Sequence, residues 1–180
     1  MRVITGKARG VQLKTPDGHK TRPTADRVKE ALFSIIQFDV PGTNVLDLFG
    51  GTGQLGIESL SRGANSAVFV DADEKACNLI RENLHRCKME REGTVVRSDY
   101  LAFLSRCRQK FHIIFLDPPY AEVFLENALK MISEIDILES GGIIVAERPV
   151  GKPLLCEFSG FSRSKDYKYG QTLLTLYRKD

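Results

Sequence analysis

The segment Asp117-Pro118-Pro119-Tyr120 carries the clearest chemical signal in the sequence. It follows the apolar run 112–116, so it occupies the loop after an expected strand. An exocyclic nucleobase nitrogen is a poor nucleophile, because its lone pair is delocalised into the ring. The Asp117 carboxylate and the Pro118 carbonyl, exposed by a proline-fixed backbone, could accept its hydrogens and stabilise developing positive charge. With Tyr120 as a stacking face for the base, these four residues are the predicted catalytic set, against the alternative of a turn without chemistry.

A glycine-rich turn between an expected strand, Val45–Phe49, and an expected helix, 55–62, is the second signal. Glycines permit positive φ and a close approach of the backbone to a ligand. Asp47, near the strand end, could hold a cationic amine such as the α-ammonium of S-adenosylmethionine. The predicted cofactor contacts in this segment are Asp47, Phe49, Gly50, Gly51, Thr52 and Gly53.

The same turn also matches a dinucleotide fingerprint. Gly51, Gly53 and Gly56 spell G-x-G-x-x-G, and Asp71 follows Gly51 by 20 residues. A nicotinamide-dependent oxidoreductase is therefore an alternative, and a glycine turn without any ligand is another. Asp47 disfavours the first of these because its carboxylate would repel a pyrophosphate, and that function would leave the motif at Asp117 unexplained.

Acids also follow the next two expected strands, 67–70 and 94–96. Asp71 is placed to accept both ribose hydroxyls of a nucleoside cofactor, and we prefer it to Asp73 because it directly follows the apolar run. Asp99 could accept from the adenine amine, and it could equally be the N-cap of the following helix.

Apolar runs alternate with amphipathic helical patterns over residues 41–180, which predicts an α/β, doubly wound, mostly parallel sheet. The last run, Thr172–Tyr177, follows no helix and suits an antiparallel edge strand. Before this core, residues 1–40 are expected to form a β-hairpin of Arg2–Thr5 and Val11–Lys14, then a helix with Thr24 as its N-cap. A single domain spanning residues 1–180 is expected from the length.

Charge is unevenly distributed in this chain of 180 residues with net charge +3. Residues 1–30 carry a net +5 and residues 151–180 a net +3, whereas the centre carries −5. Basic ends suit a polyanion such as nucleic acid, and an ordinary solvated surface is the alternative. No C-x-x-C pair, signal peptide or long apolar stretch is visible, so reduced cysteines, no metal, no membrane association, a cytoplasmic location and a monomer are expected.

These motifs together resemble the RsmD family, the 16S ribosomal RNA guanine-N2 methyltransferases among the class I S-adenosylmethionine-dependent amino-methyltransferases. The resemblance covers nearly the whole chain. It is carried by Arg2-Val3-Ile4, Gly6, Arg9-Gly10, Arg22-Pro23-Thr24, Asp26-Arg27-Val28, Glu30-Ala31-Leu32-Phe33, Leu46 through Gly53, Asp117 through Tyr120, Tyr169-Gly170 and Thr172. Position 71 is more often Glu in the family and position 50 often Ala, which are conservative departures.

The resemblance implies a Rossmann-like sheet of seven strands, S-adenosylmethionine as cofactor, and methylation of the N2 of a guanine in 16S rRNA. It also implies that Arg22 and Thr24 lie over the methionine end of the cofactor. Candidate RNA contacts are Lys7, Arg9, Arg22 and Lys168. Without a separate RNA-binding domain, the expected partner is 16S rRNA shaped by proteins, in the small subunit or an assembly intermediate.

Two further functions compete with this interpretation. A DNA amino-methyltransferase acting on adenine N6 or cytosine N4 would share the motif at Asp117, but such enzymes usually need a sizeable target-recognition region. A non-catalytic RNA-binding or assembly factor could retain the fold, and the intact motif argues against it.

Overall fold

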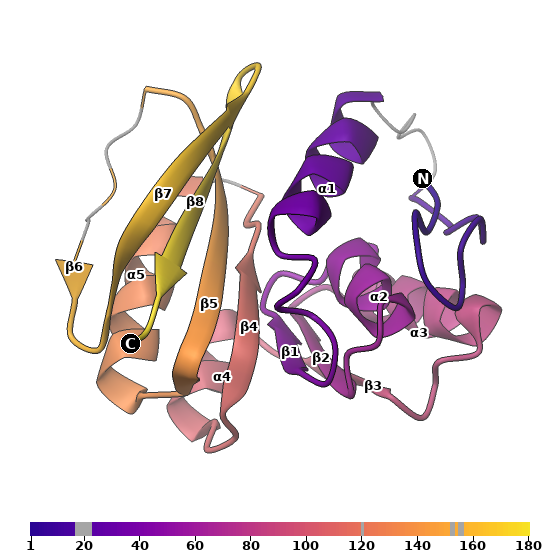
Figure 1. Cartoon of the computed structure of the whole chain (residues 1–180). Coiled ribbons are helices and arrows are strands. Elements are labelled where there is room, and N and C mark those ends of the chain that lie inside the picture. Colours follow the sequence, from indigo (N-terminus) through magenta and orange to yellow (C-terminus); the bar gives the residue numbers. More distant parts are fainter. Residues whose placement is uncertain (17–22, 120, 152–153, 155–156) are drawn as a thin grey trace.

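The computed structural model describes residues 1–16, 23–119, 121–151, 154 and 157–180 (Figure 1). Helices and strands alternate up to β5, after which only strands follow. In chain order the elements are α1 (Pro23–Ile35), β1 (Asn44–Asp47), α2 (Gln54–Ser61), β2 (Ser66–Asp71), α3 (Glu74–Cys87), β3 (Gly93–Arg97), α4 (Tyr100–Arg106), β4 (Phe111–Leu116), α5 (Ala121–Ile135), β5 (Leu138–Pro149), β6 (Glu157–Phe158), β7 (Phe161–Tyr169) and β8 (Thr172–Arg178).

The strands form one mixed sheet in the order β3-β2-β1-β4-β5-β8-β7-β6. Neighbours from β3 to β5 are parallel, and β8, β7 and β6 add antiparallel to that edge. The α/β doubly wound prediction is confirmed, but the sheet has eight strands, so the expected number of seven is wrong. No apolar run marks β7, which is mostly exposed and rich in Lys and Ser, or β6, which has only two residues, so neither strand was predicted. An edge strand needs no apolar run because solvent faces it.

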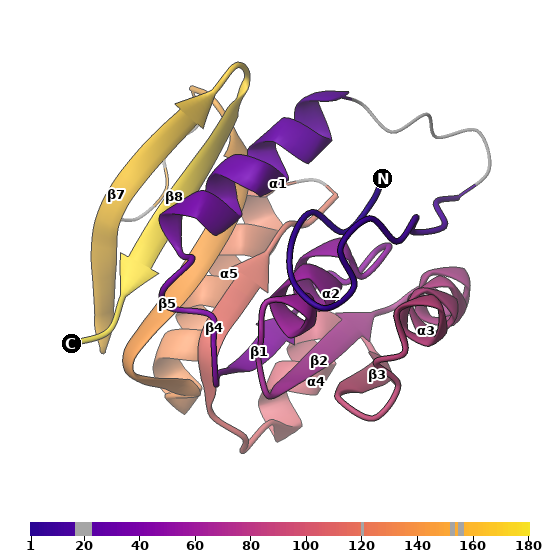
Figure 2. The same cartoon turned by 45° about the vertical axis from the view of Figure 1, so that its right-hand side comes forward.

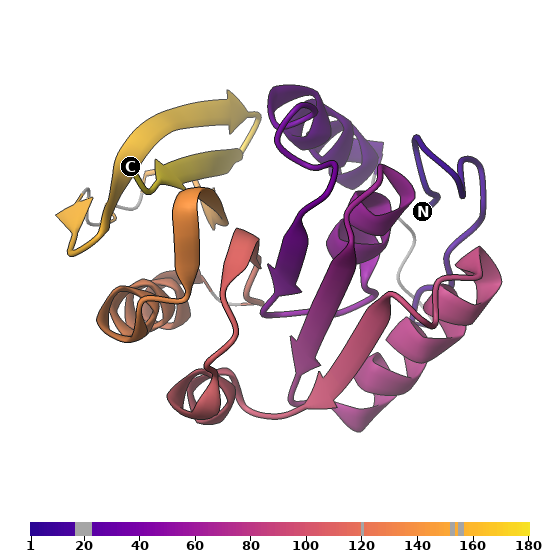
Figure 3. The ribbon, with the colours of Figure 1, turned by 60° about the horizontal axis from the view of Figure 1, so that its bottom comes forward.

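Helices cover both faces of the sheet, as Figure 3 shows from one end. Alternate strand residues point to opposite faces and build two cores. Val45 and Phe115 belong to the core under α1, α2 and α3, whereas Leu46 and Leu116 belong to the core under α4 and α5. The strand order reverses between β1 and β4, so a ligand crevice is expected at the carboxyl ends of these strands.

The N-terminal segment, residues 1–16, has the antiparallel pairing of the predicted hairpin but forms no regular strands. A single isolated antiparallel bridge joins Arg2 and Gln12. Val3 N–H donates to the Val11 carbonyl at 3.0 Å and Leu13 N–H to the Met1 carbonyl at 3.1 Å, whereas the amides of Ile4 and Thr5 leave this pairing and donate to the Glu58 carboxylate of α2 at 2.8 and 3.0 Å. Figure 2 shows the segment lying beside α2.

The first helix begins at Pro23, so Thr24 lies inside it and is not the N-cap that we expected. Proline is favoured at a first helical position because its missing amide would have no partner there. None of the described helices has the length and apolar character needed to cross a membrane.

Candidate active site

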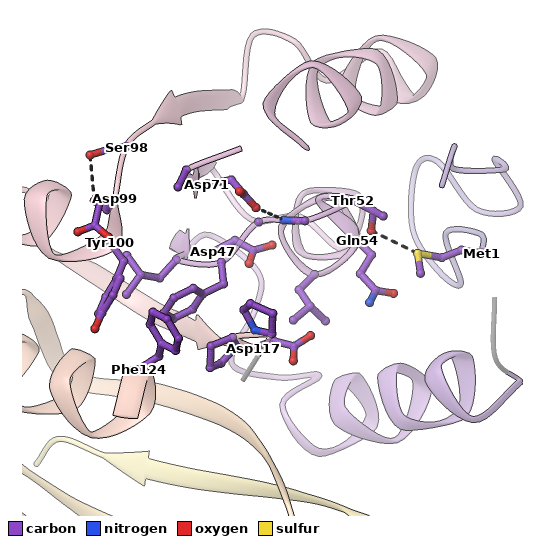
Figure 4. A pocket seen from close by; sticks show the side chains of 18 residues that line it. Met1, Asp47, Thr52, Gln54, Asp71, Ser98, Asp99, Tyr100, Asp117 and Phe124 are labelled. Carbon is purple, nitrogen blue, oxygen red and sulfur yellow. Dashed lines mark hydrogen bonds between the residues drawn. The ribbon is translucent and has the colours of Figure 1, made fainter. Parts of the chain in front are cut away.

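A cavity of about 640 Å³ opens at the carboxyl ends of β1 to β4 (Figure 4). Most of the predicted cofactor and catalytic residues that the structure describes line it together. They are Asp47, Phe49, Gly50, Gly51, Thr52, Asp71, Asp99, Asp117, Pro118 and Pro119. A volume of this size falls within the range of small-molecule and cofactor sites, about 300–1,000 Å³.

The glycine turn has the backbone that its sequence indicated. Gly51 and Gly53 adopt φ of +55° and +76°, and Gly53 precedes the first residue of α2 without lining the cavity. Gly56, the last glycine of the apparent dinucleotide fingerprint, has a different role. A Cβ at this position would lie 2.2 Å from Cε1 of Phe69, so Gly56 permits close packing of α2 on β2.

Backbone amides at this turn already have carboxylate partners. Gly51 N–H donates to Oδ2 of Asp71 at 2.9 Å, and Gly56 N–H donates to Oδ2 of Asp47 at 3.2 Å. A pyrophosphate at this turn would compete with both acids and meet their negative charge. The geometry therefore favours a cofactor without phosphates over a dinucleotide.

The structure distinguishes the acids that follow β2. Asp73 is the N-cap of α3, accepting from Lys75 N–H at 3.0 Å, whereas Asp71 lines the cavity. Asp99 lines the cavity as well, and its Oδ1 caps α4 by accepting from Leu101 and Ala102 at 2.9 and 3.1 Å. The capping role of Asp99 is thus confirmed. Its contact with adenine, which would use the other oxygen, Oδ2, stays a prediction.

Aromatic side chains form an apolar wall, of which the sequence had indicated Phe49 but not Tyr100 or Phe124. Phe49, Tyr100 and Phe124 have ring centroids 5.2, 5.5 and 6.3 Å apart, and all of them line the cavity. Such a wall can pack against a flat ring, as an adenine would require. Tyr100 directly follows Asp99, which was a usable signal, but Phe124 on α5 is brought there only by the fold.

The cavity is acidic and lacks a cation among the described side chains. Burial raises the pKa of Asp47 to about 8; the hydrogen bond from Gly56 N–H opposes this rise, and the charges of Asp117 and Asp71 add to it. Burial likewise raises the pKa of Asp117 to about 6. In the part of the chain that the structure describes, neither carboxylate takes part in an ion pair. A cationic ligand would relieve both shifts.

The predicted RNA contacts are scattered. Lys7 pairs with Glu92 at 2.8 Å, and its N–H bonds the carbonyl of Ser61 at the last residue of α2, so it is not brought to the cavity. Arg9 is exposed beside a hollow of about 270 Å³ between the N-terminal segment and α1. Lys168 is exposed near the turn of the β7–β8 hairpin, at the sheet edge where β5 ends.

Some predicted residues fall outside the described part of the chain. Arg22 and Tyr120 are among them, and the side chain of Thr24 is not described either, so their roles stay predictions. The described cysteines Cys77, Cys87 and Cys107 are free and buried. Among described residues, no group of His, Cys, Asp or Glu forms a candidate metal site.

Comparisons with known proteins identify the family of the chain. The model of the family described as "Conserved hypothetical protein 95" matches residues 1–178. YlbH of Bacillus subtilis, provisionally named an rRNA methyltransferase, is 40% identical and covers 99% of both chains. Ribosomal RNA small subunit methyltransferase D of Escherichia coli is 31% identical over 100% of this chain and 90% of its own length. The solved structure of YhhF from Escherichia coli, provisionally named a methyltransferase, superposes with a TM-score of 0.89 at 30% identity, covering 100% of this chain and 98% of that one. The chain therefore belongs to the family described as conserved hypothetical protein 95, the RsmD family of methyltransferases.

Proposed function

We propose that the protein transfers a methyl group from S-adenosylmethionine to the N2 of a guanine in 16S rRNA. The observation that carries this proposal is the convergence of Asp117, Pro118 and Pro119 with the glycine turn on one cavity. The names of the relatives support ribosomal RNA as the substrate class. The DNA alternative gains no support from those names.

The residues of the cavity fit S-adenosylmethionine. The buried Asp47 carboxyl, with its raised pKa and no ion pair to any described residue, suits the α-ammonium group. Asp71 suits the ribose hydroxyls, and the wall of Phe49, Tyr100 and Phe124 suits the adenine. When bound, this cofactor supplies the electrophilic methyl group.

The chain itself would then hold and activate the target nitrogen. The Asp117 carboxylate and the Pro118 carbonyl accept the two N2 hydrogens, which orients the nitrogen lone pair toward the methyl donor. The carboxylate also stabilises the positive charge that develops on nitrogen. Because the pKa of Asp117 is raised to about 6, the group is a better proton acceptor than an ordinary aspartate and still ionises near neutral pH.

RNA would approach across the carboxyl edge of the sheet. Lys168, at the β7–β8 hairpin, and Arg9, in the N-terminal segment, lie on either side of α1 and offer exposed cations for phosphate contacts. These few exposed cations can contact only a few nucleotides, so we expect the substrate to be RNA already shaped by ribosomal proteins. Naked 16S RNA should then be methylated more slowly than the ribonucleoprotein.

The test is tritium transfer from labelled S-adenosylmethionine to small subunits that lack the modification, with nucleoside analysis of the product. Label in N2-methylguanosine of 16S RNA, lost in Asp117→Ala, supports the proposal. Asp73→Asn is a matched control, because this acid caps α3 outside the cavity and asparagine can also cap. Label in DNA or in another nucleoside would overturn the substrate assignment.

A further inference from the structure

Carboxylates stand side by side at the ends of β4 and β5. Leu116 is registered with Ala146, so the residues that follow them, Asp117 and Glu147, are neighbours across the two parallel strands. Leu116 and Ala146 belong to the core under α4 and α5. By strand alternation, Asp117 and Glu147 point to the opposite face, the face of Asp47.

Glu147 has no partner of its own in the described part of the chain. It is half-buried, and no hydrogen bond or ion pair of the described residues engages its carboxyl. The adjacent Arg148 does not serve it, because that guanidinium bonds the Thr175 hydroxyl at 2.8 Å and Asp166 at 2.9 Å. Because Glu147 is only half-buried and its carboxyl has no partner among the described residues, the carboxyl is available to a ligand that brings N–H groups.

The groups that face Glu147 explain its electrostatics. From β4 it meets Asp117, from β8 the registered neighbour is Leu174, and beyond that lies Tyr167 of β7. Burial, and then the charge of Asp117, raise the pKa of Glu147 to about 7. Glu147 therefore forms a pair of acids with Asp117, which lines the cavity, and no described cation acts on Glu147.

Guanine differs from adenine and cytosine at the ring nitrogen next to the exocyclic amino group. Its N1 carries a hydrogen next to the N2 amino group, whereas the corresponding ring nitrogens of adenine and cytosine carry a lone pair. A carboxylate accepts from the first and repels the second. A second acid next to Asp117 is thus the group that a guanine edge requires.

We propose that Glu147 is a specificity-determining residue, whose carboxylate accepts the N1–H of the target guanine while Asp117 and Pro118 hold its N2. This inference rests on the proposed function. It adds a residue on a strand that the motif at Asp117 does not include. It also accounts for a choice of base that Asp117 alone, which contacts only the amino group, does not make.

The test compares small subunits carrying guanine or 2-aminopurine at the modified nucleotide. 2-Aminopurine keeps the N2 amino group but has a lone pair at N1. The wild type should prefer guanine by about 10- to 100-fold in kcat/KM. Glu147→Gln, whose amide can donate to that lone pair, should reduce this preference at least about tenfold, by losing guanine activity and keeping or gaining 2-aminopurine activity.

Controls separate specificity from folding. Glu139→Gln alters an acid at the opposite end of β5 and should leave the preference unchanged. Equal losses of Glu147→Gln on both bases, or an unchanged preference, would overturn the inference. If the wild type does not methylate guanine N2 at all, the proposed function fails before any variant is made, and this inference fails with it.

The pH profile gives a second readout that a merely structural residue would not move. At saturating cofactor, both acids must be ionised to accept hydrogens, so log kcat/KM of the wild type should rise below pH 6 with a slope of about two. In Glu147→Gln the slope should fall to about one. An unchanged slope would count against a direct contact between Glu147 and the base.

Discussion

Buried charges occur in two regions of the molecule, and the two regions treat them differently. Glu58 of α2 is fully buried, accepts from the amides of Ile4 and Thr5 in the N-terminal segment, and pairs with Arg62 at 2.8 Å. The Lys29 ammonium lies 3.9 Å from Glu58 and donates to the Arg2 carbonyl at 2.7 Å. In the cavity, by contrast, Asp47 and its neighbouring acids form no ion pair with the described residues.

The difference separates groups that hold the fold from groups that await a ligand. The Glu58 cluster is complete within the chain, and it fixes the N-terminal segment so that Met1 reaches the cavity and bonds Thr52. The acids of the cavity and the adjacent Glu147 are incomplete: burial raises the pKa values of Asp47, Asp117 and Glu147, so ionising them costs the free protein stability. Removing a charge should therefore destabilise the first region and relieve the second.

The largest effect should come from Asp117→Asn. Loss of the charged acceptor should lower the rate of methyl transfer by about 10²–10⁴-fold, the range for one electrostatic or general-base group. The free energy of unfolding at pH 8 should be unchanged or higher, because asparagine has no charge to desolvate. Single-turnover kinetics and urea unfolding measure the two effects. A rate within tenfold of the wild type, or a clear loss of stability, would show that Asp117 is not one of the acids that lack a partner until a ligand binds.

The opposite result is expected for Glu58→Gln. It leaves the Lys29 ammonium buried without its counter-charge, and breaking a buried pair in this way costs about 3–5 kcal/mol of unfolding free energy. The unfolding temperature should fall by roughly 2–4 °C for each kcal/mol in a chain of this size. Glu82→Gln, which breaks the exposed Lys14–Glu82 pair, is the matched control and should change the midpoint little. Equal effects of the two substitutions would contradict the distinction drawn here.

A third prediction concerns the pH dependence of stability. The folded pKa of Asp47, about 8, lies above its ordinary value of 3.8, and those of Asp117 and Glu147 are raised to about 6 and 7. Between the ordinary and raised values the folded state binds more protons than the unfolded state, so stability falls as pH rises through this window. Urea unfolding of the free protein should show a decline from pH 5 to 8.

Asp47→Asn sharpens this test, because it should flatten the upper part of the decline and make the free protein more stable than the wild type at pH 8. Asp73→Asn, at an exposed helix cap, should leave the decline in place. A wild-type stability that rises between pH 5 and 8 would mean that other groups dominate, and that the cavity acids are not strained.

The sequence predicted the parallel half of the sheet well because each of its strands is a short apolar run that ends near an acid. Asp47, Asp71 and Asp117 were found by this rule, and the structure places all of them at the cavity. Glu147 obeys the same rule after the run 142–146, but its meaning depends on the register of β5 against β4. Strand pairing is a non-local property that a single sequence does not display.

Non-local contacts also explain the weaker predictions. The N-terminal segment has the alternation and glycines of a hairpin, yet its amides bond Glu58, which is 53 and 54 positions away in the chain. Lys7 looked like a phosphate contact, yet the fold pairs it with Glu92. In both cases a residue distant in the sequence, and not the local pattern, determines the contact that forms.

The smallest predicted effect is a change of less than one proton when the cofactor site is filled. At pH 7 a group with a pKa of about 8 is mostly protonated, so an α-ammonium placed against Asp47 should ionise it and release a proton. Calorimetry with S-adenosylhomocysteine in buffers of different ionisation enthalpy measures this release.

Methylthioadenosine, which lacks the amino acid part, is the matched ligand and should release none. Asp47→Asn should abolish the release and weaken S-adenosylhomocysteine binding selectively. Equal release with both ligands would show that the proton leaves another group. Release that depends on the α-ammonium would show that the ligand completes the cavity as Lys29 and Arg62 complete Glu58.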